Sequence, residues 1–292
     1  MLSYQHAYHA GGAADLHKHL ALAALLEPLA GLGIAYVESH AGRGLYDLAA
    51  PEAAKTGEAA QGLGRLVAAL PDGPPEGAFW NVLVALRARD GGDAYPGSPA
   101  VAASILGGED SLTLFERHPA EYRALTASRG RLDAFSRGRA GPRIVLHAED
   151  GHAALTRKGA LEGPAVVLID PSYEVKAEYA TTAATALAAA RAPGMVSVVV
   201  WYPILPDGRH DALVAPVTDA LGPPGDGSGC LVHEVAFQDL PARGMVGSGI
   251  LVLNPPPHAD VTVERAMAPC APVFAVTKGA HRPAGRPTGR GA

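Results

Sequence analysis

The chain has 292 residues, a formal net charge of −5 at pH 7 and an apolar fraction of 48%. Its length allows one large domain or two ordinary ones, and its composition is ample for a sizeable core. The negative net charge argues weakly against a protein wrapped in nucleic acid, but it does not exclude an enzyme with a local basic face. The only cysteines, Cys230 and Cys270, have neither a CxxC nor a Cys/His metal spacing. We therefore expect no disulfide framework and no zinc site, as in a protein of the reducing cytoplasm.

An apolar stretch near the beginning of the chain, His19–Ala30, is long enough to suggest a signal-peptide core. It carries Glu27 and Pro28, and the residues before it include Asp15 and several histidines rather than a basic segment. We therefore interpret it as a buried or amphipathic helix. No other segment approaches the ~18 uninterrupted apolar residues of a membrane span, so we expect a protein without a membrane partner.

Four of the twelve histidines lie in the first nineteen residues, and His6 and His9 are spaced so that they could share a helix face with a metal ion. No third acidic or cysteine ligand accompanies them at a metal-binding spacing. We therefore expect histidines that form hydrogen bonds or face phosphate, and no metal site.

Apolar runs with the length of β-strands recur along the chain, and most are separated by helix-like stretches. Strands that alternate with helices predict an α/β fold with a largely parallel, seven-stranded sheet. The Ala-rich stretch Tyr179–Arg191 is typical of these helical spacers, and a Pro-Gly breaker follows it. The seven predicted strands are Ile34–Val37, Leu112–Phe115, Arg143–Leu146, Ala165–Ile169, Met195–Trp201, Leu231–Phe237 and Ile250–Leu253.

The gap between the first and second predicted strands is too long for a structureless loop. Within it, Glu52–Leu70 and Ala78–Arg89 have helical patterns, with a Pro/Gly-rich link between them. We therefore expect a small helical insertion at residues 46–94 within a single domain of residues 1–277. Residues 278–292 carry four cations and no acid, and we expect a flexible basic tail that is a solvated terminus rather than an arm on phosphate.

Acids and glycines follow the first three strands, at the sheet edge where ligands of open parallel sheets bind. Glu38 ends the first strand, and Gly42 and Gly44 lie in the next turn, where a missing side chain lets the backbone approach a ligand. The second strand ends on Glu116, whose carboxylate can accept both hydroxyls of a ribose. Asp150–Gly151 follows the third strand, in a position to meet the edge of an adenine ring.

S-adenosylmethionine suits this pattern better than a nicotinamide dinucleotide. The dinucleotide fingerprint requires GxGxxG and an acid ~20 residues later, whereas here the third glycine is missing and Glu116 lies far beyond that spacing. S-adenosylmethionine has no pyrophosphate, but its amino-acid end requires polar side chains. His40 in SHAG and Ser98 in YPGSP can provide them, although a turn histidine and a helix N-cap serine are equally ordinary readings.

The fourth strand ends on Asp170-Pro171-Ser172-Tyr173, which we name the DPSY turn. Asp-Pro commonly starts a turn and a tyrosine commonly covers a core edge, so a structural reading is available. In a chemical reading, the Asp170 acid, a backbone carbonyl freed from the ladder and the flat ring of Tyr173 are what a site for a planar amine would need.

Several motifs in order carry a resemblance to a known family. The DPSY turn resembles the amino-methyltransferase signature [D/N/S]-P-P-[Y/F/W]. The segments MLSYQHAYHAGGAADLHKH, SHAG, YPGSP, LIDPSYE, WYP and RGMVGSGILVLNPP resemble specifically the large-subunit ribosomal RNA methyltransferase J family, bacterial enzymes that methylate N6 of a single adenine in 23S rRNA with S-adenosylmethionine. The resemblance covers residues 1–257 and implies a Rossmann-like class I methyltransferase fold with a small inserted helical subdomain.

The resemblance also implies roles for individual residues. Asp170 matches the catalytic acid, with Pro171 and Tyr173 beside it, and Tyr4 matches a tyrosine that handles the RNA. The family pattern has a second proline where this chain has Ser172, which lacks the fixed φ of proline; we expect activity to be retained. The positions that match those around S-adenosylmethionine are Lys18, His19, His40, Ser98, Glu116, Asp150, Gly151 and Asp170.

Two further segments have open interpretations. Arg243, in the glycine-rich RGMVGSG segment, is available for an RNA phosphate, although a solvated arginine in a hairpin linker is as plausible. Trp201–Pro203, which ends the fifth strand, either supports a base or closes the core.

A 23S rRNA adenine-N6 methyltransferase, acting as a cytoplasmic monomer, is the function that we expect. DNA adenine and protein glutamine methyltransferases share the logic of the DPSY turn, and aspartate at position 170 favours a nucleobase only mildly. A cofactor-binding RNA factor without catalysis is the alternative from another class, supported by Ser172 and by the acidic net charge.

Overall fold

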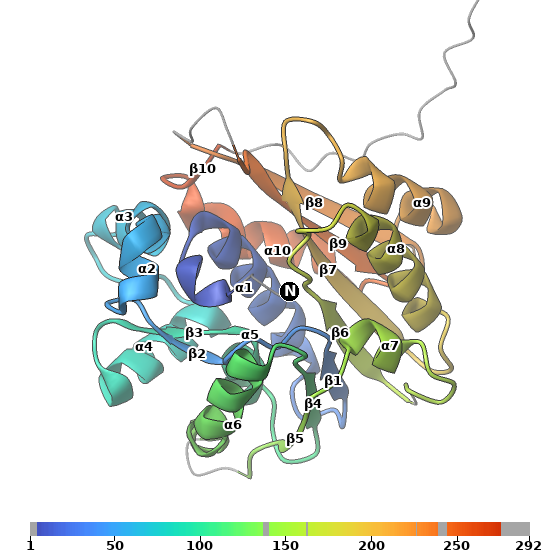
Figure 1. The fold of residues 1–292 in the computed structure, drawn as a ribbon, viewed down its shortest axis with the longest axis horizontal. Helices are drawn as coiled ribbons and strands as arrows, with labels where there is room; N and C mark the ends of the chain where they lie inside the picture. The colour runs from blue at the N-terminus through green and yellow to red at the C-terminus, as the bar shows by residue number, and fades with distance from the viewer. Residues whose placement is uncertain (1–4, 137–139, 162, 226, 239–243, 276–292) are drawn as a thin grey trace, which may run out of the picture.

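The structure is a computed structural model that describes residues 5–136, 140–161, 163–225, 227–238 and 244–275 (Figure 1). Its centre is an eight-stranded sheet with the order β10-β8-β9-β7-β6-β1-β4-β5. The five strands from β5 to β7 run parallel, whereas the pairs β7–β9, β9–β8 and β8–β10 are antiparallel. The predicted α/β fold with a mostly parallel sheet is confirmed.

All seven predicted strands are present, and the predicted strand count is wrong by one. Phe274 and Ala275 pair with the edge of β8 as an eighth strand, and two residues are too few to show a period in the sequence. The strands of the sheet are β1 (Ala35–Glu38), β4 (Ser111–Phe115), β5 (Arg143–His147), β6 (Ala165–Ile169), β7 (Val196–Ile204), β8 (Cys230–Phe237), β9 (Gly247–Leu253) and β10 (Phe274–Ala275).

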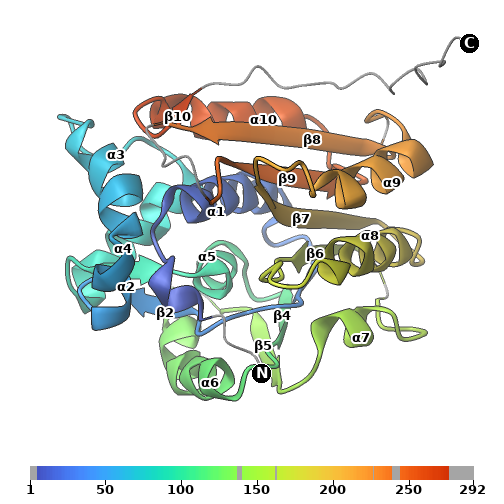
Figure 2. The ribbon, with the colours of Figure 1, turned by 45° about the horizontal axis from the view of Figure 1, so that its top comes forward.

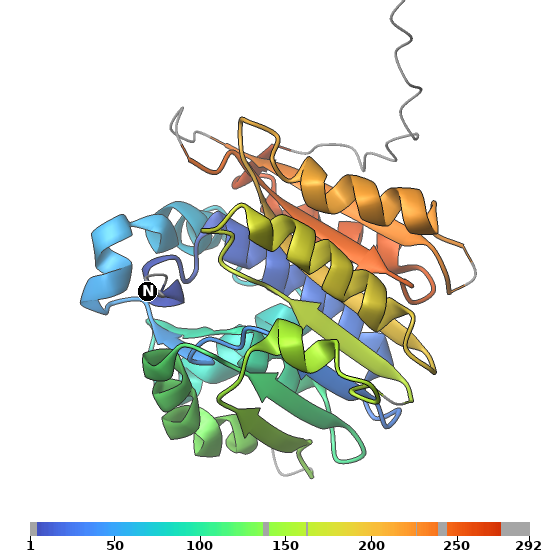
Figure 3. The same cartoon turned by 45° about the vertical axis from the view of Figure 1, so that its right-hand side comes forward.

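Helices cover both faces of this sheet, which explains why the central strand β6 is buried at every residue. Figure 3 shows α8 (Ala177–Ala190) and α9 (Asp211–Leu221) on one face, and α1 (Ala13–Leu26) and α10 (Ala259–Met267) on the other. The remaining helices of the sheet are α5 (Ser98–Ile105), α6 (Pro119–Asp133) and α7 (Gly151–Leu155). No helix among the described residues is long and apolar enough to cross a membrane.

Helix α1 begins six residues before the apolar stretch that predicted it. Its first turns contain Asp15, His17, Lys18 and His19, all of which are buried. α1 packs against α5, α10 and the strands β7 and β9, so little of its surface faces water. A polar segment in such a place points to a site, because buried charges require partners.

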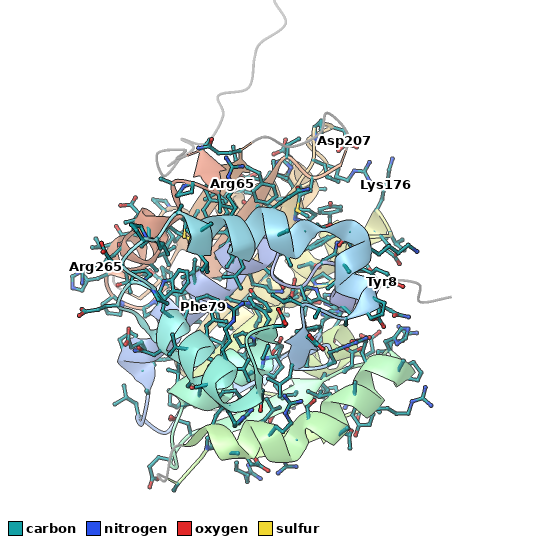
Figure 4. All side chains as sticks on the ribbon, turned by 90° about the vertical axis from the view of Figure 1, so that its left-hand side faces the viewer. Tyr8, Arg65, Phe79, Lys176, Asp207 and Arg265 are labelled. Atoms are coloured by element: carbon teal, nitrogen blue, oxygen red, sulfur yellow. The ribbon has the colours of Figure 1, made fainter. Side chains whose placement is uncertain are left out.

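Between β1 and β4 the chain forms mainly helices. Within this stretch, strands β2 (Leu45–Asp47) and β3 (Ala94–Pro96) pair antiparallel and enclose a helical segment between them, ahead of α5. Figure 2 shows its helices beside α1, and Figure 4 views the same side. The segment shares the central core through Phe79, Trp80 and Leu83. Its helical elements are α2 (Pro51–Thr56), the π-helical turn η3 (Ala60–Gly64), α3 (Arg65–Ala68) and α4 (Ala78–Asp90).

Candidate functional site

A cavity lies at the carboxyl ends of β1, β4 and β6 and is closed on one side by the start of α1. All nine residues that the sequence predicts for the cofactor line it: Lys18, His19, His40, Gly42, Ser98, Glu116, Asp150, Gly151 and Asp170. Ser172 and Glu178 also line it, as do His6, Tyr46, Arg117, His118 and His152. The structure therefore brings together residues that are spread over more than 150 positions of the sequence.

Glu116 ties the turn after β1 to the end of β4. Its Oε2 accepts a hydrogen bond from the backbone N–H of Gly42 at 2.8 Å, and its Oε1 accepts one from His118 N at 2.6 Å. Burial raises the pKa of this carboxyl, although the two backbone donors oppose the shift. Each carboxylate oxygen has a further lone pair, so the predicted contact with ribose hydroxyls stays compatible with this geometry.

The turn after β1 approaches α7 too closely for any side chain at position 151. A Cβ on Gly151 would lie 2.1 Å from the carbonyl oxygen of Ser39. Asp150 caps α7 by accepting from Ala153 N at 3.0 Å, and Arg117 donates to its other oxygen at 2.7 Å. Because Gly151 has no side chain, the start of α7 packs directly on the turn after β1, and its cap Asp150 reaches the cavity.

His40 lies between this turn and α7. Its Nδ1 is 2.7 Å from Ser39 Oγ, and its ring is 5.1 Å from that of His152. Burial, and secondly the neighbouring His152, lower the pKa of His40 to about 3. The imidazole is therefore neutral at physiological pH, with one nitrogen that donates and one that accepts.

Asp170 is joined to α1 by a partly buried ion pair. Lys18 Nζ donates to Asp170 Oδ2 at 2.6 Å and lies 3.0 Å from Asp15 Oδ1, while His6 Nε2 contacts Asp15 at 2.8 Å. Burial alone would lower the pKa of Lys18, but the two carboxylates raise it above its ordinary value. Lys18 is therefore a permanent cation that orients Asp170. Asp15 was not among the predicted site residues, although its spacing of three from Lys18 on a helix is the signal for such a pair.

His19 has a nitrogen that no residue of the described chain uses. Its Nδ1 is 2.9 Å from Tyr95 Oη, whereas its Nε2 is buried without a hydrogen-bond partner among the described residues. Burial lowers the pKa of His19 to about 3, so the ring is neutral. Because a buried polar atom without a partner is costly, Nε2 is suited to a ligand that fills the cavity.

Ser98 is not the N-cap of α5, because Gly97 occupies that position. Its hydroxyl instead donates to Glu38, which also accepts from Tyr36 Oη at 2.9 Å. Glu38 is fully buried, and burial raises its pKa to about 8 against the lowering effect of these two donors. The sequence predicted Glu38 at a strand end but not among the residues of the cofactor site.

The DPSY turn presents Asp170 and Ser172 to the cavity, but not Tyr173. Tyr173 is buried, donates its hydroxyl to the carbonyl of Trp201 at 2.7 Å and packs against the ring of Tyr179 at 4.5 Å. Its φ of +54° is a strained conformation for an aromatic residue. In this structure its ring closes the core, so stacking on a base requires it to leave these contacts. Tyr4 and Arg243 lie outside the described residues.

His6 and His9 each pair with an acid rather than with each other. His6 contacts Asp15, and His9 Nδ1 lies 2.8 Å from Glu58 of the helical segment. Nearby, Lys55 of α2 lies over the ring of Tyr8, which Figure 4 labels beside that helix. Within the described part of the chain, no three His, Cys, Asp or Glu side chains are arranged to hold a metal ion.

Known proteins resemble this chain in both sequence and fold. Residues 32–283 match the family described as Ribosomal RNA large subunit methyltransferase D, RlmJ. Ribosomal RNA large subunit methyltransferase J of Escherichia coli (strain K12) is 31% identical over 265 residues, and its namesake from Haemophilus influenzae is 32% identical over 266; both alignments cover 88% of each chain. The crystal structure of protein LPL1258 from Legionella pneumophila is 26% identical, with a TM-score of 0.72 over 90% of this chain and 95% of that one.

Proposed function

The chain belongs to the RlmJ family of large-subunit ribosomal RNA methyltransferases, and we propose that it methylates N6 of a single adenine in 23S rRNA. The family, the enzyme class and the cofactor, S-adenosylmethionine, agree with the sequence-based predictions. The observation that carries the proposal is the ion pair of Asp170 with Lys18 inside a cavity that all nine predicted cofactor residues line.

The residues of the cavity fit S-adenosylmethionine. The unpartnered Nε2 of His19 is a buried polar atom that a ligand can satisfy, and the close approach at Gly151 leaves a cradle that a Cβ would fill. Glu116 and Asp150 supply acceptors for the hydroxyls and amine of an adenosine, while neutral His40 supplies a donor or an acceptor. When bound, S-adenosylmethionine supplies a methyl group activated by a sulfonium.

The DPSY turn supplies the groups that prepare the acceptor nitrogen. The lone pair of an adenine amine is delocalised into its ring, so the site has to localise it. Lys18 occupies Asp170 Oδ2, which leaves Oδ1 to accept one N–H of the amine, and the Pro171 carbonyl accepts the other. These two bonds direct the lone pair towards the methyl group, and positioning of this kind supplies most of the acceleration.

Asp170 also receives the proton that the product amine releases, directly or through water. Lys18 holds the carboxylate in position for that step, because its Nζ donates to Asp170 Oδ2 at 2.6 Å. The adenine has to leave its stack to reach this cavity, so the enzyme acts on an exposed or flipped base.

The test is methyl transfer from labelled S-adenosylmethionine into protein-free 23S rRNA that lacks its own modification, followed by digestion to nucleosides. We expect N6-methyladenosine at one site. We expect Asp170→Ala to abolish turnover while the dissociation constant of the cofactor stays within about tenfold, because the variant loses an acceptor of the substrate amine. The matched control is Asp260→Ala, an exposed acid on α10, which should keep full activity.

Either of two outcomes would contradict the proposal. Full activity of Asp170→Ala would remove this carboxylate from the chemistry. Absence of transfer to RNA, with measurable cofactor binding, would indicate another amine, and DNA and protein glutamine would then be assayed. We further propose that the protein acts in the cytoplasm. We also propose that it acts as a monomer, and sedimentation of the active protein would test its oligomeric state.

A further inference from the structure

A chain of buried polar side chains runs beneath the active site, and the mechanism above does not use it. Trp201 Nε1 donates to Ser248 Oγ at 2.9 Å, Ser248 Oγ is 2.8 Å from His17 Nδ1, and His17 Nε2 is 2.8 Å from His233 Nδ1. His17 and Ser248 are completely buried, and Trp201 and His233 are nearly so. The four residues come from β7, β9, α1 and β8, so the chain joins the helix to three adjacent strands.

The chemistry of the four groups gives the chain a direction. An indole N–H can only donate, so the oxygen of Ser248 accepts from Trp201. The hydroxyl hydrogen then points to His17 Nδ1, and the proton on His17 Nε2 points to His233. Burial and the neighbouring His233 hold the pKa of His17 well below its ordinary value, which keeps the ring neutral and able to accept from Ser248. A fully connected buried network of this kind fixes one arrangement of its elements.

Residues of this hydrogen-bond chain contact or adjoin both supports of Asp170, namely Lys18 and the DPSY turn. The next residue after His17 is Lys18, which contacts Asp170 at 2.6 Å and lies 5.9 Å from the centre of the Trp201 ring. The carbonyl of Trp201 accepts the hydroxyl of Tyr173, the last residue of the DPSY turn. Trp201 is therefore connected to Asp170 on one side through α1 and on the other through the turn.

We propose that the chain Trp201–Ser248–His17–His233 fixes α1 on the sheet and thereby holds Lys18 and the DPSY turn where Asp170 can react. In this account, which rests on the proposed methyl transfer, His17 and Ser248 are positioning residues that touch neither substrate nor cofactor. A shift of α1 would move Lys18 relative to Asp170, and a misplacement of ~1 Å can cost ~10²-fold in rate.

The test compares Ser248→Ala and His17→Leu, which break the chain, with His17→Asn, whose side-chain oxygen can replace Nδ1 as the acceptor from Ser248. The matched control is Ser197→Ala, since Ser197 also lies on this part of the sheet but donates to Asn254 O at 2.7 Å, away from α1. Turnover is measured on 23S rRNA at saturating S-adenosylmethionine. The protein has only two tryptophans, so the indole N–H resonance of Trp201 reports directly on its bond to Ser248.

We expect kcat to fall at least about tenfold in Ser248→Ala and His17→Leu while KM for RNA stays within about threefold, because the groups that touch the RNA are unchanged. His17→Asn should recover most of the loss, and Ser197→Ala should match the unaltered protein. The indole resonance of Trp201 should move in Ser248→Ala and stay in Ser197→Ala.

Three results would overturn the inference. First, an indole resonance of Trp201 that stays unmoved in Ser248→Ala would mean that the bond between Trp201 and Ser248 is absent. A moved resonance with unchanged kcat would separate the chain from catalysis, and equal losses in Ser248→Ala and Ser197→Ala would assign the effect to general destabilisation. Absence of transfer by the unaltered protein would instead refute the proposed function, and this inference with it.

Discussion

Glu38 is fully buried and accepts a hydrogen bond from Ser98, which lines the cavity, and this environment makes stability depend on pH. Burial raises its pKa to about 8 in the folded protein, from an ordinary value of 4.5. The folded state therefore binds the proton more tightly than the unfolded state, so this stabilisation is complete below pH 4.5 and is lost as the pH rises through about 8. Ser98 and Tyr36 can turn their hydroxyls to suit either form of the carboxyl.

We therefore expect Glu38→Gln, which mimics the protonated acid, to be less sensitive to alkali than the unaltered protein. The difference in melting temperature between the variant and the unaltered protein should move in favour of the variant from pH 5 to pH 9. Glu264→Gln, at an exposed position on α10, is the control and should show no such trend. A difference that does not change with pH would mean that Glu38 is ionised throughout.

The residues of the cavity were predictable to the extent that they belong to local motifs. SHAG, YPGSP and the DPSY turn place polar residues at strand ends, where topology brings them together. Asp15 and the orientation of Tyr173 were not predictable in this way. The first acts through a partner, Lys18, whose burial is a property of the packed fold, and the second depends on a contact with Trp201 that lies on another strand.

At the scale of elements, the cavity depends on how closely the turn after β1 meets α7. A Cβ at position 151 would lie 2.1 Å from Ser39 O, whereas one at Gly130, inside α6, would meet no atom within 4 Å. We expect Gly151→Ala to lower the free energy of unfolding by ~1–3 kcal/mol, because the backbone must separate, and to weaken cofactor binding. Gly130→Ala should stabilise the protein by up to ~1 kcal/mol through its better helix propensity.

Denaturant unfolding and cofactor titration of both glycine variants would check this. Unchanged stability and affinity in Gly151→Ala would show that α7 can move away from β1 without cost, and the cradle would then have no part in binding.

Strands were predictable from the sequence where both faces of the sheet are covered. β6 and its neighbours are continuous apolar runs because helices cover both faces of the sheet. The start of α1 was not predictable from hydropathy, because its first turns are polar and nevertheless buried. The helices between β2 and β3 lie within residues 46–94, and whether that segment is a separate subdomain stays a prediction. These differences share one cause, since polar residues of a site are buried by the fold and not by their own hydropathy.

At the scale of the whole molecule, an acidic protein has to bind RNA, so the placement of its cations matters. Residues 278–292 contain four cations and no acid, and they lie outside the described residues. Each phosphate contact that releases counterions contributes ~0.7–0.9 to the slope of log affinity against log salt concentration. An arm that used all four cations would therefore account for a slope of about three.

We expect deletion of residues 278–292 to leave both the affinity for 23S rRNA and its salt dependence unchanged, because so weak a cluster of charges is more often a solvated terminus. Binding of the unaltered and the shortened protein would be measured over a range of salt concentrations. Cofactor affinity and melting temperature serve as controls that the domain is intact. A slope reduced by two or more would instead assign the tail to the phosphate backbone, and the acidic domain would then depend on it to hold its substrate.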